Sequence, residues 1–256
     1  MSIEHKIIWN ELHSSDVDAS AAFYGALFGW AIREDERETY LHFYASADSD
    51  ETVAGLTPAH PGAPTMWQVY VGTEDIEAYA GRADAAGAKA ATPLMDIPHT
   101  GKLQIFLDAE GASLAPFQPA HADRKSWDSS GDPGRFCWVE LLTNDHAAQV
   151  AHYKQVVGWD TLEMDMGEFT YTLFTPPGGG QMDAVGGAMP MPEGAGGPSV
   201  WLPYVAVESC DASTAKAREL GATIHQEPQD IGDSGRFSVF DDPGGVTIAI
   251  YEKRGC

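Results

Sequence analysis

The sequence is poor in cysteine, in basic residues and in long apolar runs. It holds three cysteines in 256 residues, and Cys137, Cys210 and Cys256 share no CxxC spacing. This argues against a disulfide framework and against a cysteine-rich zinc site. No run approaches the roughly 20 apolar residues of a membrane helix, and the N-terminus lacks the apolar core of a signal peptide. We therefore expect a cytoplasmic protein in a reducing compartment.

Positive charge is scarce. Lysine and arginine total 15 against 38 aspartate and glutamate residues, which gives a formal net charge of −23. A field of this sign repels phosphate backbones and anionic lipid surfaces, so this acidic protein is predicted to bind neither nucleic acid nor membranes. Hydrophobic residues make up 43% of the chain, enough to bury a core.

The chain contains an internal repeat. Nine of the 26 residues between 5 and 30 recur, without a gap, 129 positions later; among them are Trp9, Glu11, Asp16 and Trp30, which match Trp138, Glu140, Asp145 and Trp159. Residues 67–118 recur at 201–252, with an offset of 134. We predict a tandem duplication, with one domain at 1–118, a polar and turn-rich linker at 119–133, and a second domain at 134–256.

Each half divides again into two units of the same order. Alternating residues predict a strand at 7–13, and Asp16 or Asp18 suits the N-cap of a helix at 18–28 that ends at Gly29. Further strands are predicted at 40–44, 52–56, 67–73, 89–95, 102–107 and 112–117, with a second helix from Glu74-Asp75 to Gly87. The predicted fold class is α+β, with four βαβββ units that form two fused halves. Each half would wrap its strands into one concave sheet around a pocket.

These residues resemble a known family. The motif Asp16…Phe23-Tyr24…Gly29-Trp30 and the closing motif Gly101-Lys102…Asp108…Gly111 are similar to those of the vicinal oxygen chelate (VOC) superfamily. That superfamily includes glyoxalase I, extradiol dioxygenases, fosfomycin-resistance enzymes and bleomycin-resistance proteins. More narrowly, the chain resembles tandem glyoxalase-domain proteins that carry the label of hydroxylases. The resemblance implies a glyoxalase-like fold in each half.

Metal-dependent members of the superfamily hold a divalent ion with residues from four strands of each half. The corresponding positions carry Trp9, Gln68, Ala115 and the region of Gly55 in the first half, and Trp138, Leu202, Ala249 and the region of Gly187 in the second. Of these, Gln68 alone can donate to a metal, and three donors are the usual minimum. We therefore expect no cofactor and no metal at this position, and we assign no catalytic residue. A displaced metal site formed by Glu11, His13, His42 and Gln68 is the alternative.

Strand alternation predicts which side chains face the two pockets. The predicted ligand-binding residues are Trp9, Glu11, His13, Gln68, Tyr70, Phe117, Trp138, Glu140, Tyr204 and Tyr251. They describe an aromatic cavity with one carboxylate per half. A purely structural role is the alternative for both carboxylates: each could cap the backbone of a neighbouring strand, or Glu11 could pair with Lys102 and Glu140 with Arg236.

The leading functional hypothesis is metal-independent binding of a small molecule that is aromatic, and neutral or cationic, as in the bleomycin-resistance branch. The rival hypothesis is a metal-dependent lyase, isomerase or oxygenase with a rearranged site. A third possibility is a member that serves in protein interaction alone. The fusion of two halves also predicts a pseudo-dimer within one chain.

Overall fold

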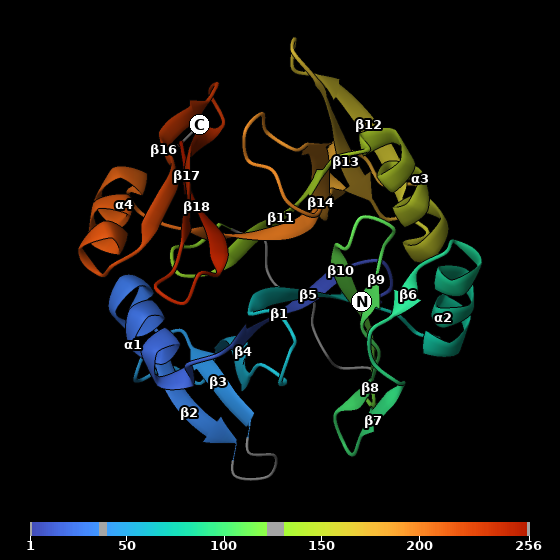
Figure 1. Cartoon of the computed structure of the whole chain (residues 1–256), viewed down its shortest axis with the longest axis horizontal. Coiled ribbons are helices and arrows are strands. Elements are labelled where there is room, and N and C mark those ends of the chain that lie inside the picture. Colours follow the sequence, from blue (N-terminus) through green and yellow to red (C-terminus); the bar gives the residue numbers. More distant parts are fainter. Residues whose placement is uncertain (1, 36–39, 122–130, 255–256) are drawn as a thin grey trace. The chain divides into compact units, whose positions relative to one another are not determined.

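The computed structural model describes residues 2–35, 40–121 and 131–254 (Figure 1). Its elements follow the predicted α+β order. The first half contains β1 (Ile7–Ser14), α1 (Val17–Phe28), β2 (Ala31–Asp35), β3 (Tyr40–Tyr44), β4 (Thr52–Pro58), β5 (Met66–Gly72), α2 (Ile76–Ala85), β6 (Lys89–Ala90), β7 (Met95–Ile97), β8 (Gly101–Leu103), β9 (Phe106–Leu107) and β10 (Ser113–Pro119). The second half contains β11 (Phe136–Thr143), α3 (His146–Val157), β12 (Asp160–Asp165), β13 (Thr170–Thr175), a short 3₁₀ helix (Gln181–Asp183), β14 (Gly186–Pro190), β15 (Val200–Ala206), α4 (Cys210–Glu219), β16 (Thr223–Ile231), β17 (Gly235–Asp241) and β18 (Thr247–Lys253).

The two halves have the same sheet topology. The strand order is β2-β3-β4-β1-β5-β10-β8-β7 in the first half and β12-β13-β14-β11-β15-β18-β17-β16 in the second. In each βαβββ module the first strand pairs in parallel with the last: β1 with β4, β5 with β10, β11 with β14, and β15 with β18. The first half adds β6 and β9, which pair with each other beside β10. The duplicated fold predicted from the sequence is therefore confirmed.

The helices begin at the residues that the sequence singles out. Asp16, Asp75 and Asp145 each accept the backbone amide three residues further on and so cap α1, α2 and α3. Ser209 does the same for α4. Gly29 ends α1 in the left-handed conformation, at φ 77°, which favours glycine.

The second module departs from the predicted strands. The segment expected as one strand at 89–95 is divided into β6 and β7, and the segment at 102–107 is divided into β8 and β9. Thr92 and Pro93 lie at the first break, where proline supplies no amide for strand pairing. The hydroxyl of Thr92 accepts from the Ile105 amide at 3.0 Å, and the Thr92 carbonyl accepts from the Gln104 side-chain amide, so side-chain hydrogen bonds accompany the one backbone bond from Ala91 to Ile105 at the breaks.

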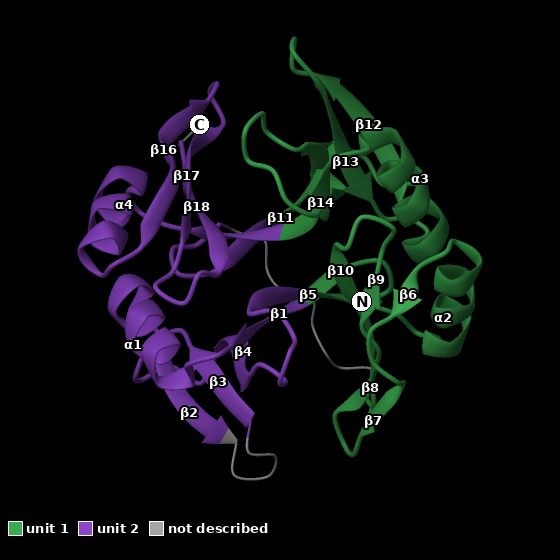
Figure 2. Cartoon of the chain, viewed as in Figure 1, with its two compact units in different colours: residues 1–8, 69–127, 139–201 green, residues 9–68, 128–138, 202–256 purple. Residues whose placement is uncertain are grey.

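The chain divides into two compact units that do not follow sequence order (Figure 2). Unit 1 comprises residues 1–8, 69–127 and 139–201, and unit 2 comprises residues 9–68, 128–138 and 202–256. Each unit therefore combines most of one module from each half. The domain boundaries at 118 and 134 remain a prediction, and most of the predicted linker, residues 122–130, lies outside the described residues.

A buried tyrosine–aspartate pair joins the two modules within each unit. In unit 2 the Tyr24 hydroxyl of α1 donates to Asp242 Oδ2 at 2.9 Å, and Asp242 Oδ1 accepts from the amides of Gly244 and Val246. In unit 1 the Tyr153 hydroxyl of α3 donates to Asp108 at 2.9 Å. Each pair ties a helix to a tight turn of the neighbouring module.

Aromatic clusters fill the space beneath the helices. In unit 2 Tyr24 packs edge to face on Trp67, with ring centroids 5.3 Å apart, and Trp30 packs on Phe43 at 5.2 Å. Unit 1 repeats the arrangement with Tyr153, Trp159, Phe174 and Trp201. Such pairs contribute beyond their buried area and form the core that holds the strands in position. Among the described residues, no helix is both long and apolar enough to cross a membrane.

Candidate functional site

The first strand presents a polar face opposite its core face. Trp9, Glu11 and His13 are partly exposed, whereas Asn10 and Leu12 are buried on the other side. The alternation follows from the two-residue period of a strand. Glu11 and His13 thus lie on the sheet face away from the helices.

The Glu11 carboxylate is surrounded by hydrogen-bond donors of unit 2. The Tyr40 hydroxyl donates to Oε2, His13 Nε2 lies 2.8 Å from Oε1, and Thr57 Oγ1 lies 3.5 Å from Oε1. The side chains of Glu11 and His13 are 12% and 13% exposed, so solvent screens them only in part.

Aromatic rings line the same face beside the carboxylate. The Trp9 indole nitrogen donates to the Tyr40 hydroxyl at 3.1 Å. The His42 ring lies edge-on to Tyr40 and to Trp9, with centroid distances of 4.7 and 6.0 Å. Gly55 makes this arrangement possible, because a Cβ atom at that position would lie 1.7 Å from the Tyr40 hydroxyl oxygen.

Strand pairing explains how these residues meet. Glu11 of β1 stands opposite Gly55 of β4, and His42 of β3 stands opposite the same glycine. Three adjacent strands therefore place the Glu11 carboxylate, the glycine without a side chain and the His42 imidazole in one row. Tyr40 lies two residues before His42 on β3, and its side chain crosses the space above Gly55 to reach Glu11.

Unit 1 contains the repeat of this arrangement without its histidines. The Tyr171 hydroxyl donates to Glu140 Oε1 at 2.8 Å, and a Cβ atom on Gly187 would lie 2.2 Å from the Tyr171 hydroxyl oxygen. Leu142 stands where His13 does in the sequence repeat, and Leu173 stands opposite Gly187 as His42 stands opposite Gly55. The glutamate–tyrosine–glycine set is thus common to both halves, and the imidazoles belong to the first half.

The remaining predicted ligand-binding residues lie on several strands. Gln68 of β5 is buried and, like Glu11, belongs to unit 2. In unit 1 the rings of Tyr70 and Phe117 are 6.5 Å apart. In unit 2 Tyr204 lies 6.5 Å from Phe237, the Tyr251 hydroxyl donates to the Ser234 carbonyl oxygen at 2.7 Å, and Trp138 is partly buried. A ligand-binding role for all of them remains a prediction.

The predicted cationic partners of the two glutamates are wrong. Lys102 Nζ lies 3.0 Å from Glu77, and Arg236 pairs with Asp211 and Asp230. The sequence reasoning missed the actual partners, Tyr40 and Tyr171, which lie between the two aligned repeat blocks. A comparison of the two strands 40–44 and 170–175 would have found them.

The Cys137 thiol of β11 is unsuited to nucleophilic chemistry. Burial raises the pKa of Cys137 to about 12, and its sulfur lies 3.6 Å from the Tyr204 carbonyl oxygen. At neutral pH the thiol therefore stays protonated.

A comparison with known proteins identifies the family. The model of the Glyoxalase/Bleomycin resistance protein/Dioxygenase superfamily matches residues 6–115 and again residues 135–250. The chain belongs to this superfamily. The match to both halves of this superfamily member confirms the resemblance drawn from its motifs.

Two curated relatives match this chain over nearly its full length. A Mycobacterium bovis protein named "Putative glyoxylase CFP32" is 31% identical over 252 residues, which cover 95% of this chain and 93% of the relative. The "Anthracycline biosynthesis protein DnrV" of Streptomyces peucetius is 30% identical over 265 residues, covering 96% and 92%.

Solved structures share the fold of this superfamily member. The Mn(II)-bound glyoxalase from Novosphingobium aromaticivorans has a TM-score of 0.65 at 20% identity and covers 100% of this chain and 84% of its own. The 2,2',3-trihydroxybiphenyl 1,2-dioxygenase from Sphingomonas wittichii has a TM-score of 0.63 at 12% identity, covering 98% and 91%. At these identities the likeness concerns the fold alone.

Of the four positions at which the fold family holds a metal, three carry no metal-ligating side chain in the first half of this superfamily member, and the fourth is the buried Gln68. At the expected positions of the first half, Trp9 uses its indole to donate to Tyr40, Gly55 is covered by the Tyr40 ring, and Ala115 has no donor atom. The alternative metal set of Glu11, His13, His42 and Gln68 remains a prediction.

Proposed function

We propose that the first half binds a small planar aromatic molecule that carries an amine or hydroxyl group, and that Glu11 recognises that group without a resident metal. The observation that carries this proposal is the composition of the Glu11 surroundings. The Tyr40 and Thr57 hydroxyls and the His13 imidazole surround the carboxylate, on the sheet face that also carries the Trp9 and His42 rings. A carboxylate of this kind favours a cationic or hydroxylic ligand.

The aromatic neighbours of Glu11 favour a flat ligand. Trp9, Tyr40 and His42 lie together on one sheet face, and their rings offer stacking surfaces and attraction for a cation. The net charge of −23 adds a field that concentrates cations and slows the approach of anions.

The first half is the better candidate of the two. Glu11 has the additional polar neighbours His13 and His42, whereas the repeat position beside Glu140 carries Leu142. One curated relative is named for anthracycline biosynthesis, and anthracyclines are planar aromatic molecules; this name supports a ligand of the same general shape.

A titration with matched probes tests the proposal. Protein dialysed against a chelator is mixed with 9-(aminomethyl)anthracene or with anthracene-9-carboxylate, and its melting temperature is recorded. The amine at about 100 times its Kd should stabilise the wild type by roughly 2.7 kcal/mol. Any effect of the carboxylate should be the same in the wild type and in Glu11→Gln.

Two variants locate the binding. Glu11→Gln should keep the fold and lose most of the stabilisation by the amine, and the matched variant Glu140→Gln should keep it. Equal responses of the wild type and Glu11→Gln would overturn the proposal. Amine binding or turnover that appears only after Mn²⁺, Fe²⁺, Ni²⁺ or Zn²⁺ is added would instead support the rival, a metal-dependent lyase, isomerase or oxygenase.

A further inference from the structure

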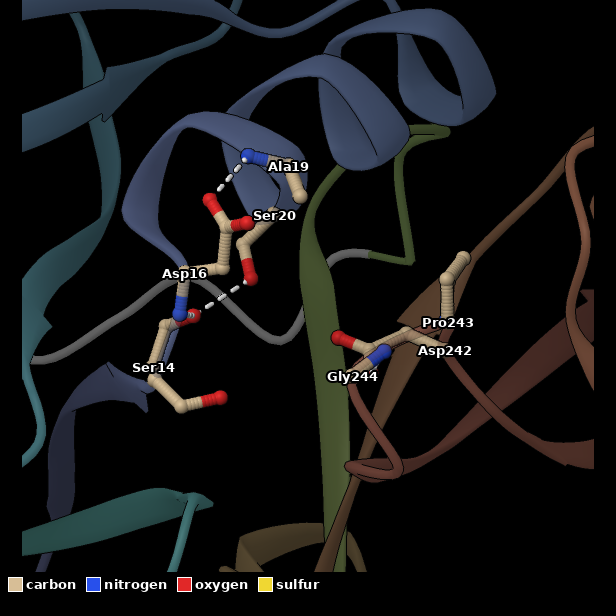
Figure 3. A pocket seen from close by; sticks show the side chains of 8 residues that line it. Ser14, Asp16, Ala19, Ser20, Asp242, Pro243 and Gly244 are labelled. Atoms are coloured by element: carbon tan, nitrogen blue, oxygen red, sulfur yellow. Dashed lines mark hydrogen bonds between the residues drawn. The ribbon is translucent and has the colours of Figure 1, made fainter.

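A cavity of about 320 Å³ lies within unit 2, at the start of α1 (Figure 3). Ser14, Asp16 and Ser20 lie on its α1 side, and the turn from Asp242 to Gly244 lies opposite. Ser14 and Ser20 are 4% and 6% exposed, so their hydroxyls belong to the interior wall of the cavity. The cavity is on the helix side of β1 and is separate from the Glu11 face.

The equivalent place in unit 1 is filled by a carboxylate of the chain itself. Glu110 Oε2 accepts from Thr143 Oγ1 at 2.6 Å, from the Asn144 amide at 3.0 Å and from the Ser199 hydroxyl. Desolvation alone would raise the pKa of Glu110, but the hydrogen bonds from Ser199, Thr143 and the backbone hold it below its usual value. The environment thus stabilises an ionised carboxylate.

The sequence repeat relates the two places residue by residue. Thr143 corresponds to Ser14 and Asn144 to Ser15, at the offset of 129 residues. Glu110 corresponds to Gly244, at the offset of 134 residues. Unit 2 has therefore kept two of the donor positions and lost the side chain that they hold.

Two hydrogen-bond donors at the cavity are available to a bound acceptor. Ser14 Oγ lies 2.8 Å from Ser20 Oγ and accepts from the Asp16 amide at 3.0 Å. Whichever serine donates to the other, one hydroxyl proton of the pair is left over. Within residues 2–35, 40–121 and 131–254, the Ser15 amide has no acceptor, although its counterpart in unit 1 donates to Glu110.

Two nearby aspartates do not exclude an anion. Asp16 Oδ1 caps α1 by accepting from Ala19, and Asp242 accepts from Tyr24 and from the amides of its own turn. Asp145 and Asp108 occupy the same places in unit 1, where Glu110 lies beside them as a third carboxylate. The 12-residue helix α1 also directs the positive end of its dipole toward the cavity.

We propose that this cavity binds the carboxylate group of a small molecule, held by the Ser14–Ser20 hydroxyl pair and the Ser15 amide. Propionate is the natural probe, because it has the size and charge of the glutamate side chain that unit 2 lacks. Ser199, the third donor in unit 1, corresponds to Thr65, which does not line the cavity. We therefore expect millimolar affinity for propionate.

The test uses amide NMR spectra of the full chain. Propionate should shift the Ser15 and Asp16 amide signals with saturation in the millimolar range, and neutral propionamide should not. Ser14→Ala should weaken propionate about tenfold, which is the effect expected for one hydrogen bond to a charged group. Absence of saturable shifts in the wild type would overturn the proposal.

Two exchanges between the repeats provide matched controls. Gly244→Glu should fill the cavity and abolish the propionate response; a Cβ atom there would lie 3.2 Å from Asp242 Oδ1, a contact that a small shift relieves. Glu110→Gly should create a second site, seen as propionate-dependent shifts of the Asn144 amide. An unchanged propionate response in Gly244→Glu, or no response at Asn144 in folded Glu110→Gly, would contradict the site.

Discussion

Replacing Tyr24 with phenylalanine removes one hydroxyl that links α1 to the Asp242 turn of unit 2. This hydroxyl donates to Asp242 Oδ2 at 2.9 Å and accepts from the Trp67 indole nitrogen at 3.1 Å. Tyr24 is fully buried and Trp67 is 2% exposed. Water cannot readily replace the missing partner, so both groups lose a hydrogen bond.

The expected loss follows from the two broken interactions. A hydrogen bond to a charged group contributes about 1.5–3 kcal/mol, and a buried donor without a partner costs about 1 kcal/mol or more. We expect Tyr24→Phe to lower the free energy of unfolding of unit 2 by about 2–4 kcal/mol. In urea denaturation this appears as a lower midpoint with an unchanged slope.

The loss should depend on pH through Asp242. Desolvation raises the pKa of Asp242 above its ordinary 3.8, and the Tyr24 hydrogen bond opposes this rise. A group whose pKa is higher in the folded than in the unfolded chain stabilises the fold at pH values below its unfolded pKa. This contribution is lost as the pH rises through the folded pKa. Tyr24→Phe raises the folded pKa further, so its destabilisation should be larger at pH 8 than at pH 4.

Tyr251→Phe is the matched control within unit 2. The Tyr251 hydroxyl donates to the Ser234 carbonyl at a more exposed position, so its removal should cost at most about 1.5 kcal/mol and show no such pH dependence. A Tyr24→Phe variant as stable as this control, or one whose destabilisation shrinks as the pH rises from 4 to 8, would contradict a stabilising Tyr24–Asp242 hydrogen bond.

Three further outcomes are expected. Gly55→Ala forces Tyr40 away from Glu11 and should lower stability by about 1–3 kcal/mol in thermal denaturation; an unchanged melting temperature would count against the packing described. Arg135→Ala removes a two-pronged pair with the largely exposed Glu51 and should cost at most about 1 kcal/mol, less in high salt; a larger, salt-independent loss in urea titrations would contradict this. Cys137, with a pKa raised by burial, should react with Ellman's reagent at pH 8 only as the chain unfolds, and fast labelling in a native variant that keeps Cys137 alone of the three cysteines would disprove its protection.

Much of the fold could be predicted because its signals are local. Asp16 and Asp145 are typical N-cap residues, and Gly29 is typical of a helix end in the left-handed conformation. The tryptophans identify the repeat. The broken strands near Thr92 were missed because the side-chain hydrogen bonds at the breaks depend on a neighbouring strand. The pairing of modules within each unit was also missed, since no local pattern states which module Tyr24 contacts.

The candidate site could be predicted only in part. The two-residue period of β1 indicated the face shared by Trp9, Glu11 and His13. It did not indicate Tyr40, because that contact requires β3 and the absence of a side chain at Gly55. The cations chosen as partners from the sequence were wrong for the same reason: a charge match says nothing about which strands are adjacent.

The central claim is that Glu11 recognises an amine- or hydroxyl-bearing aromatic ligand without a metal. Calorimetric titration of 9-(aminomethyl)anthracene into chelator-treated protein tests it most directly. We expect equal affinity for the wild type and Glu140→Gln, and an affinity at least about tenfold lower for folded Glu11→Gln, because a charge-assisted contact is lost. Equal affinity of the wild type and Glu11→Gln, or binding that requires an added divalent metal, would contradict it.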